Sequence, residues 1–336
     1  MSTHETARGP WRLTLVTNPD DCNLACAMCP CSAPRPGPRP RRMAPGLALA
    51  VLDERRGSPL HEVIPSTMGE PLLWTGLPAL LDRCAALGFA VNLTTNGTWP
   101  GLGVSGWAAK LLPVLSDVKV SWNGATQRTA AAVMAGLDLA AAERDLETWS
   151  TLRDAHAAAG GRRSTLSLQV TVQAANVDEV PAIVALAGRL RVDRVKLNHL
   201  QPRPGLAVTV EGSLLRDAPG LARWNRAVQG ARRAAEASAA NGWPLRVENA
   251  VPLREDPADR VTRGRCPFLG REAFVHFDGR LAPCPHPEAE ALGDLGSVAD
   301  APLGELWDAH AFRALREAWP SHPLCQSCAF RAPGGA

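Results

Sequence analysis

Cysteines are the side chains most capable of chemistry in this chain of 336 residues, and their nine positions fall into two groups and one isolated residue. Four lie in the stretch DDCNLACAMCPC, shortly after the apolar run RLTLV. An odd number of cysteines with close local spacing does not favour disulfide pairing in a reducing compartment. The pattern instead favours thiols that bind a metal or act in catalysis.

Three of the four cysteines in the first group, Cys22, Cys26 and Cys29, have the spacing C-x3-C-x2-C, and we name these three the N-terminal cysteine set. One loop with this spacing can bring three thiolates to a single metal centre. Structural zinc normally takes four protein ligands, whereas three leave one position open, as in an iron-sulfur cluster with one iron not bound by protein. Cys31 could complete a zinc site, but it and Cys29 flank one proline and are cramped for two ligands on one ion. We therefore favour a cluster, keep zinc and buried inert thiols as alternatives, and expect Cys31 to be a bystander.

The second group, named the C-terminal cysteine set, has four thiols, enough to close one metal site fully. Its members are Cys266, Cys284, Cys325 and Cys328. Two separated cysteines followed by a C-x2-C pair fit either a zinc ribbon or an iron-sulfur cluster. The remaining Cys84 lies in the helical pattern LLDRCAALGF, where we expect a thiol packed in the core.

Short β-branched runs alternate with longer Ala/Leu-rich stretches over the first two hundred residues. The runs predict strands at residues 13–16, 62–65, 90–95, 117–122, 166–172 and 192–200, and apolar periodicity predicts helices near 46–55, 76–87, 106–114, 127–158 and 178–190. Six strand-helix units in series predict an α/β fold whose parallel sheet curls into a barrel or part of one. Chemistry in such folds collects in the loops after the strands' carboxyl ends, and the N-terminal cysteine set lies in the first of these loops.

The pattern changes after residue 205. A helical pattern at 213–240 leads to Asp278-Gly279, a hairpin signal, and to an amphipathic helical pattern at 303–319. We expect a boundary between 205 and 262, with a small cysteine-bearing domain beyond it. The Pro/Arg-rich piece at 30–42 is expected to be an irregular, solvated loop.

Composition narrows the class of protein. A net charge of +3 spread over 36 basic and 33 acidic residues gives no reason to expect nucleic acid or an anionic membrane surface as a partner. The sequence has neither a secretory signal pattern nor the ~18 uninterrupted apolar residues of a membrane span. We predict a cytoplasmic protein that binds no nucleic acid and no membrane.

On these residues the sequence resembles the radical S-adenosylmethionine (SAM) superfamily. The resemblance implies a partial (β/α)6 barrel of the TIM type over residues 12–205, after a tail at 1–11. It also implies a [4Fe-4S] cluster on the N-terminal cysteine set, with the amine and carboxylate of SAM on the open iron.

Further matches to that superfamily follow in chain order. STMGEPLL resembles its Gly-Gly-Glu-Pro segment, with Met68 in place of the first Gly, and VSWNG resembles an element that meets the ribose, with Asn123 replacing an acid; TTNG ends the third strand as in relatives. The resemblance implies that the SAM-binding residues are Gly69, Glu70, Pro71, Ser121, Asn123 and Asn176. Each also has an ordinary explanation, because glycines turn chains and Ser121 can pair with backbone.

Residues 262–336 resemble the SPASM extension, or its shorter twitch form, joined by a helical connector at 206–261. The resemblance implies a small cysteine-rich α+β domain. Four cysteines suffice for one auxiliary [4Fe-4S] cluster with every iron bound by protein, which leaves electron transfer as its role.

The resemblance implies reductive cleavage of SAM, with a donor such as ferredoxin or flavodoxin, to a 5'-deoxyadenosyl radical that abstracts a substrate hydrogen. We expect oxidative modification of a ribosomally made peptide. The alternatives are dehydrogenation of a sugar- or amino-acid-like small molecule and peptide epimerisation with Cys31 as hydrogen donor. More remote are an iron-sulfur electron carrier or redox sensor that does not cleave SAM, and a zinc-binding interaction module.

Two polar residues near the end of the sixth predicted strand, Lys196 and His199, are candidates for the substrate side of the site. Lys196 alternates with apolar neighbours and could face solvent, and His199 could only satisfy a backbone carbonyl. About eleven residues precede the first strand. We therefore expect no fused leader-binding domain, and either a separate leader-binding protein or a smaller substrate.

Overall fold

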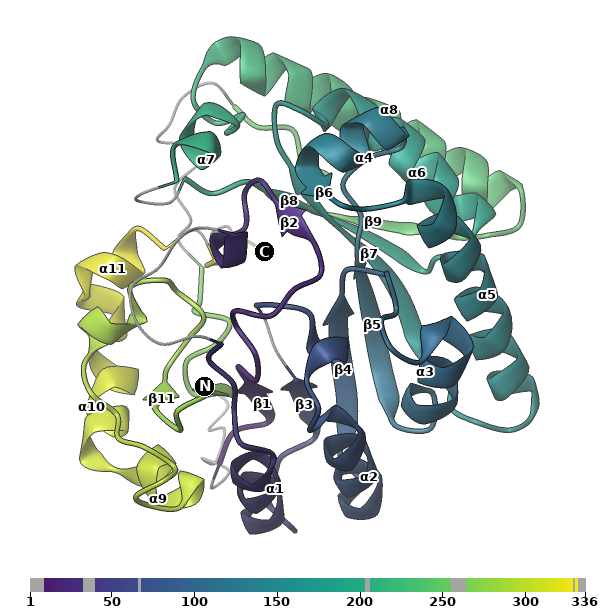
Figure 1. Cartoon of the computed structure of the whole chain (residues 1–336). Helices are drawn as coiled ribbons and strands as arrows, with labels where there is room; N and C mark the ends of the chain where they lie inside the picture. The colour runs from purple at the N-terminus through teal and green to yellow at the C-terminus, as the bar shows by residue number, and fades with distance from the viewer. Residues whose placement is uncertain are drawn as a thin grey trace. The chain divides into compact units, whose positions relative to one another are not determined.

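The computed structural model describes residues 9–32, 40–65, 68–202, 206–254, 264–328 and 330–331. The chain forms two compact units, and Figure 1 labels the helices and strands of both. The first unit comprises residues 1–20, 39–92 and 257–336, and the second comprises residues 21–38 and 93–256. The C-terminal cysteine set belongs to the first unit and the N-terminal cysteine set to the second.

The first unit is built around five strands. They are, in spatial order, β11 (Leu281–Ala282), β10 (Glu272–Val275), β1 (Arg12–Leu15), β3 (Glu62–Pro65) and the start of β4 (Ala90–Thr95). All neighbours are parallel except the β10/β11 hairpin. Arg12 donates to Glu62 at 2.6 Å and to Glu272 at 2.5 Å, which ties the starts of three strands together. The hairpin expected from Asp278-Gly279 is present, and it adds to the edge of β1, which the sequence did not predict.

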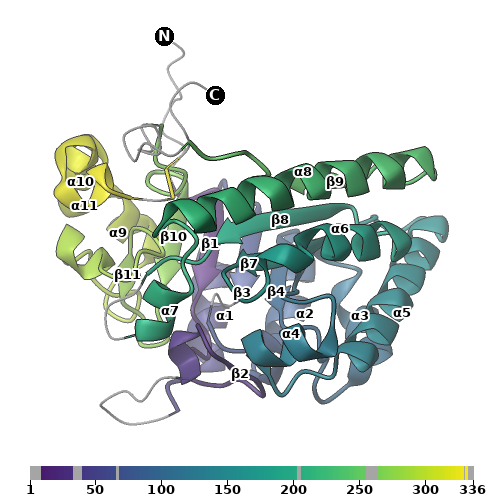
Figure 2. The same ribbon diagram turned by 90° about the horizontal axis from the view of Figure 1, so that it is seen from above.

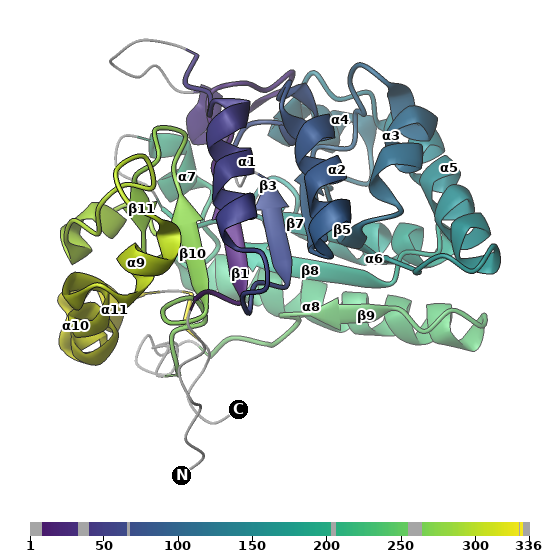
Figure 3. The same ribbon diagram turned by 90° about the horizontal axis from the view of Figure 1, so that it is seen from below.

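Two helices, α1 (Pro45–Glu54) and α2 (Leu77–Leu87), lie side by side against the strands of this unit (Figure 3). Helix α2 ends at Gly88, whose φ of 74° is the left-handed conformation that glycine adopts easily. Its apolar face buries Cys84 completely, as expected for a core thiol.

The C-terminal part of the first unit contains short helices. They are α9 (Leu303–Asp308), α10 (His310–Ala318) and α11 (Pro323–Gln326), with 3-10 turns η5 (Ala289–Leu292) and η6 (Trp319–Ser321). Glu54 of α1 accepts hydrogen bonds from the first amides of α9, Leu303 N at 2.7 Å and Gly304 N at 2.9 Å. The single helix predicted at 303–319 is therefore two, because Ala309 is extended with ψ of 153°.

The second unit has four parallel strands. They are, in spatial order, β5 (Leu115–Ser121), β7 (Thr165–Val172), β8 (Arg194–His199) and β9 (Arg246–Glu248). Strand β7 shows the alternation that sets the two faces, since Leu166, Leu168, Val170 and Val172 are all 0% exposed. A separate antiparallel pair joins β2 (Ala25–Cys26) to β6 (Met134–Ala135).

Helices follow the strands of the second unit. They are α3 (Gly103–Leu111), α4 (Gln127–Val133), α5 (Leu139–Ala158), α6 (Val180–Arg189), α7 (Ala207–Glu211) and α8 (Ala218–Ala240), with the 3-10 turn η3 (Val177–Glu179) before α6. The long α8 runs beside α6 (Figure 2). The single helix predicted at 127–158 is wrong: β6 and Gly136, with φ of 96°, interrupt it, and Asp138 caps the new helix by accepting from Ala141 N.

All six predicted strands occur, each followed by helical structure, so the α/β expectation is confirmed. Residues 33–39 of the proline-rich piece lie outside the described residues, and its start forms a 3-10 turn at Pro30–Ser32. Within the described part of the chain, no helix combines the length and apolar composition that crossing a bilayer needs.

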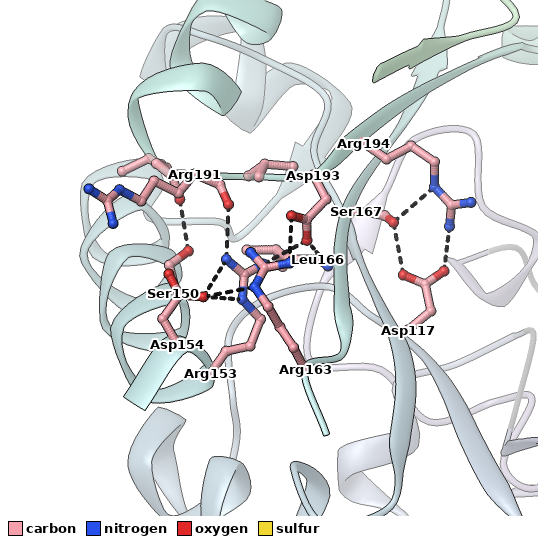
Figure 4. Close-up of polar contacts among 12 residues, drawn as sticks. Asp117, Ser150, Arg153, Asp154, Arg163, Leu166, Ser167, Arg191, Asp193 and Arg194 are labelled. Atoms are coloured by element: carbon pink, nitrogen blue, oxygen red, sulfur yellow. Dashed lines mark hydrogen bonds and ion pairs between the residues drawn. The ribbon is translucent and has the colours of Figure 1, made fainter. Parts of the chain in front are cut away.

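A buried arginine fastens the amino ends of β7 and β8 (Figure 4). Arg153 of α5 has a fully buried side chain and donates to Asp193 at 2.7 Å and to the carbonyl of Arg191 at 3.1 Å. Asp193 in turn accepts from Leu166 N at 2.8 Å and from Arg163 at 3.0 Å. A surface cavity lined by Asp154, Ala157, Arg163, Asp193, Trp243 and Pro244 borders this network. Because this network ties α5 to the amino ends of β7 and β8 through a buried ion pair, we assign it to stability.

Replacing Arg153 with Met is expected to lower the free energy of unfolding by about 3 kcal/mol, because it removes the buried partner of Asp193. The matched control is Arg163→Met, which removes the ion pairs of a 39% exposed arginine with Asp154 and Asp193 and should cost less than about 1 kcal/mol. Urea unfolding followed by circular dichroism measures both. Equal losses in the two variants would contradict the assignment.

Candidate functional site

The N-terminal cysteine set lies in a loop that is fixed by backbone pairing. Strand β2 contains Cys26, which pairs with Met134 of β6, and Ala27 N donates to Val133 O at 3.2 Å. A turn follows, in which Cys29 N donates to Cys26 O at 3.0 Å. The loop that carries the thiols is therefore anchored to the segment between α4 and α5.

The three thiols of this set are close enough to affect one another's ionisation. Burial, with smaller contributions from the thiols of Cys29 and Cys22, raises the pKa of Cys26 to about 12. Backbone amides nevertheless point at sulfur: Leu24 N lies 3.4 Å from Cys22 Sγ, and Cys31 N lies 3.4 Å from Cys29 Sγ. Such a group of thiols is stable as thiolates only beside strong positive charge, which a bound metal centre supplies.

Among the described residues, no three Cys, His, Asp or Glu side chains are placed to hold a single metal ion. The residues of the N-terminal cysteine set do fit a larger group with several metal atoms, because their sulfurs share one loop and N–H donors face two of them. Cys31 is partly exposed beside the set, and its described contact is through its backbone N–H.

The TTNG segment at the end of β4 contacts this loop directly. Asn96 Nδ2 donates to Asn23 Oδ1 at 2.8 Å and lies 3.7 Å from Cys22 Sγ. Asn96 Oδ1 accepts from Thr98 N and Oγ1, and Thr98 Oγ1 accepts from Asn23 Nδ2 at 2.8 Å. The sequence indicated a strand end here but did not predict that Asn96 orients the first cysteine.

The three residues expected near the ribose and adenosyl group lie at the carboxyl ends of β5 and β7. Ser121 ends β5 and is half-buried. Asn123 is buried, and its Oδ1 accepts from Thr171 N at 2.7 Å. Asn176 is also buried; its Nδ2 donates to the carbonyls of Asn123 and Thr171, and its Oδ1 accepts from Gln173 N. These amides therefore fix the two loops to each other.

Glu179 is a residue of this site that the sequence did not reveal. Its carboxylate accepts from Ala125 N at 2.6 Å and from the hydroxyls of Thr126 and Thr129 at 2.7 Å each. Burial alone would raise its pKa, but these hydrogen bonds outweigh burial and lower the pKa below its ordinary value. Glu179 thus holds the loop after β5 in place from the turn before α6. No motif signals it, since its partners are brought near only by the fold.

In the first unit, Gly69, Glu70 and Pro71 form a tight turn after β3. Gly69 has φ of 73°, a conformation that favours glycine. Glu70 is 1% exposed; its Oε1 accepts from Leu72 N at 3.2 Å and caps the 3-10 turn η2 (Pro71–Leu73). Asn18 Nδ2 donates to Glu70 O at 2.7 Å, which ties the turn to the segment after β1.

The two candidates for the substrate side of the site, Lys196 and His199, lie in different environments. His199 packs its ring edge against Trp224 of α8, with centroids 4.4 Å apart, and burial lowers its pKa to about 4. Lys196 is three positions earlier in β8, on the opposite face, and pairs in register with Gln169. His199 is thus a neutral packing residue near pH 7, whereas Lys196 lies on the face turned away from α8.

Side-chain amides share that face with Lys196. Asn198 Nδ2 donates to Gln169 Oε1 at 3.1 Å, and Asn249 Nδ2 donates to Asn198 Oδ1 at 3.3 Å. All four residues are partly exposed, so this face presents hydrogen-bonding groups to solvent. We name Gln169, Lys196, Asn198 and Asn249 the amide-lysine row.

The C-terminal cysteine set lines one pocket of the first unit together with apolar side chains. The apolar lining consists of Phe268, Leu292, Trp319, Leu324 and Phe330. Burial is the main cause that raises the pKa of Cys284 to about 11; the backbone N–H of His286 opposes the rise, and the other three thiols add to it. Leu269 N also donates to Cys266 Sγ at 3.3 Å. Four thiols that line one pocket, with N–H donors at two of them, fit an iron-sulfur cluster that is bound fully by protein.

Comparisons with known proteins agree with this geometry. The Radical SAM superfamily model matches residues 19–137, and the model of the SPASM iron-sulfur cluster-binding domain matches residues 266–329. The PqqA peptide cyclase of Xanthomonas campestris pv. campestris (strain 8004) is 28% identical over 267 residues, covering 77% of this chain and 64% of that protein. The PqqA peptide cyclase of Methylobacterium sp. (strain 4-46) is 29% identical over 272 residues, with the same coverage. The chain thus spans about 64% of the length of these relatives.

Solved structures of similar fold include Streptococcus suis SuiB bound to S-adenosylmethionine. Its TM-score is 0.68 at 13% identity, over 98% of this chain and 74% of SuiB. The protein anSMEcpe with bound AdoMet has a TM-score of 0.65 at 15% identity, over 95% of this chain and 85% of its own. The expected fold, a partial barrel of the (β/α)6 type with a C-terminal extension, is confirmed by this likeness.

Changing Cys22, Cys26 and Cys29 together to Ala is expected to remove roughly half of the iron from protein reconstituted without oxygen, because one of two four-iron clusters loses its ligands. Iron and sulfide assays on the full chain measure the loss. Cys84→Ala is the control and should leave the iron content unchanged, since this thiol is buried in α2. Unchanged iron in the triple variant would contradict the assignment.

Replacing Glu179 with Gln is expected to lower the free energy of unfolding by about 1.5 kcal/mol at pH 7, because charge-assisted hydrogen bonds to the loop after β5 are weakened. The folded pKa is lowered, so this stabilisation is complete above the unfolded pKa and is lost as pH falls through the folded pKa. Urea unfolding of both proteins from pH 7 to pH 3 should therefore show a shrinking difference.

Asp178→Asn serves as the control for that series, because Asp178 is 70% exposed and pairs only with Arg223 among its described ion pairs. Its effect should stay below about 1 kcal/mol at every pH. A Glu179→Gln difference that grows on acidification would show that the carboxylate does not hold the loop.

Proposed function

We propose that this chain, whose residues 19–137 match the Radical SAM superfamily model and whose residues 266–329 match the SPASM iron-sulfur cluster-binding domain, reductively cleaves SAM and oxidatively modifies a ribosomally made peptide. The observation that carries the proposal is the placement of three thiols in one anchored loop, with Asn96 and two backbone amides directed at sulfur. When bound there, a [4Fe-4S] cluster and SAM supply a 5'-deoxyadenosyl radical that abstracts hydrogen from the substrate.

In this proposal the chain's own residues bind and orient the cluster and SAM. The N-terminal cysteine set holds the first cluster and leaves one iron for SAM. Gly69, Glu70 and Pro71 present a rigid turn to the methionyl end of SAM, while Ser121 and the Nδ2 donor of Asn123 serve the ribose. Asn176 and Glu179 fix the loops from which these groups project.

The amide-lysine row is the proposed substrate-facing surface. Side-chain amides both donate and accept, as the backbone of a peptide does, and their mutual hydrogen bonds hold them in place. Lys196 adds one positive charge at the same face. The PqqA peptide cyclase relatives give independent support for a peptide substrate.

The C-terminal cysteine set is proposed to hold one auxiliary [4Fe-4S] cluster with every iron bound by protein. Such a cluster has no open position for substrate, so it takes up the electron that an oxidised substrate releases. A small one-electron donor of the ferredoxin or flavodoxin class is the proposed reductant of the first cluster.

The proposal is tested by incubating the reduced, reconstituted full chain with SAM and measuring 5'-deoxyadenosine by chromatography. The wild type should form it, and the variant with Cys22, Cys26 and Cys29 changed to Ala should form at least 100-fold less, on the order expected when the cofactor itself is lost. The Cys84→Ala variant should match the wild type. Full iron content without 5'-deoxyadenosine would instead identify an electron carrier.

A further inference from the structure

Strand β9 is the last strand of the second unit's sheet (Figure 3), and among the described residues it pairs with β8 on one side and with no strand on the other. Arg246 N donates to Asp193 O at 3.1 Å, so Arg246 and Glu248 direct their backbone groups to β8. Alternation along the strand then directs the N–H and C=O of Val247 to the other side, which we call the free edge of β9. None of the residues that the structure describes forms a hydrogen bond with these two groups or with the C=O of Leu245.

The segment that follows β9 is fastened to a helix and leaves this edge unpaired. Ala250 O accepts from Arg232 Nη2 at 2.8 Å, and Val251 O accepts from Trp224 Nε1 at 2.9 Å, so both carbonyls are directed at α8. Val247 itself is partly exposed. A fixed edge with unpaired backbone donors and acceptors is the arrangement to which an extended peptide adds as a further strand.

The face of the sheet beside this edge carries positive charge that has no acidic partner. Lys196 pairs in register with Glu248, and Arg194 with Arg246, so these four side chains share the face of the amide-lysine row. Arg194 forms ion pairs with Glu248, at 3.4 Å, and with Asp117. Within the described part of the chain, neither Lys196 nor Arg246 takes part in an ion pair. The face therefore complements a negatively charged group.

We propose that the peptide substrate adds an extended segment to the free edge of β9, and that an acidic side chain of this segment faces Arg246 and Lys196. The inference rests on the proposed function, because it takes a peptide as the substrate. Main-chain hydrogen bonds to Leu245 and Val247 supply affinity, and alternate side chains of the segment supply specificity. This pairing places the peptide beside the amide-lysine row.

Binding to the reconstituted full chain is measured by the fluorescence anisotropy of a synthetic peptide of alternating threonine and valine with glutamate at its centre. Val247→Pro removes the outward N–H but no bond to β8, because proline is tolerated where an edge N–H faces solvent. It should weaken binding about tenfold. Val247→Thr keeps the N–H and is the matched control, which should bind within about twofold of the wild type. Equal binding by Val247→Pro and the wild type would overturn the inference.

The charge part of the proposal has its own pair of variants. Arg246→Gln should weaken binding of the glutamate peptide about threefold and leave a peptide with glutamine in its place unaffected. Arg226→Gln changes an exposed arginine of α8 and should alter neither affinity. Equal losses in the two variants would show that the acidic side chain does not face Arg246.

Methylation of the peptide's own backbone nitrogens tests the pairing even if Val247→Pro does not fold. An added strand uses the N–H of every second residue, so methyl groups at one set of alternate positions should weaken binding and those at the other set should not. Equal effects of both sets, or no binding of the glutamate peptide, overturn the inference. A wild type that dimerises in ultracentrifugation, with the dimer lost in Val247→Pro, would make a second copy of the chain the occupant and also overturns it.

Formation of 5'-deoxyadenosine from SAM distinguishes failure of this inference from failure of the proposed function. A chain that forms 5'-deoxyadenosine but fails the binding tests keeps its proposed radical chemistry and loses the strand addition at β9. A chain with both clusters that forms no 5'-deoxyadenosine overturns the proposed function, whatever its affinity for the peptide.

Discussion

Thiols collected in a partly buried place repel one another once ionised, and this constraint governs both halves of the molecule. Burial and neighbouring thiols raise the pKa of Cys26 and of Cys284, so neither of these two thiols would be ionised near neutral pH without a bound metal centre. A multiply charged iron-sulfur core removes the conflict, because its positive irons stabilise several thiolates at once. The rest of the fold must hold the thiols near one another until that core is bound.

Hydrogen bonds to the backbone hold the thiols near one another. The loop of the N-terminal cysteine set is fixed by the pairing of β2 with β6 and by Asn96, while the C-terminal set depends on the β10/β11 hairpin and the turns around it. Asn123 and Asn176 act in the same way, because their side-chain amides connect two loops by hydrogen bonds to backbone groups. A motif residue in this protein can thus contribute to a cofactor site by holding the surrounding loops in position, without contacting the cofactor itself.

The sequence predicted what depends on local pattern. Strands with alternating buried residues, such as β7 (Thr165–Val172), and cysteines at fixed spacing are recognisable without tertiary information. It did not predict β2 and β6, which have two residues each and no periodicity, nor β9 with three. It also missed the position of β10 beside β1 and the role of Glu179, since both depend on partners far away in the chain. The sequence offered both Lys196 and His199 as candidates for the substrate side, and the packing of His199 against Trp224 is what excludes His199.

The central claim is that the N-terminal cysteine set holds a four-iron cluster with one iron left for SAM. Mössbauer spectroscopy of the full chain reconstituted with 57Fe, recorded with and without SAM, tests it most directly. The account predicts two [4Fe-4S] clusters in which SAM changes the spectrum of about one iron in eight. A spectrum that SAM leaves unchanged, or a protein that binds zinc in place of iron at these thiols, would contradict it.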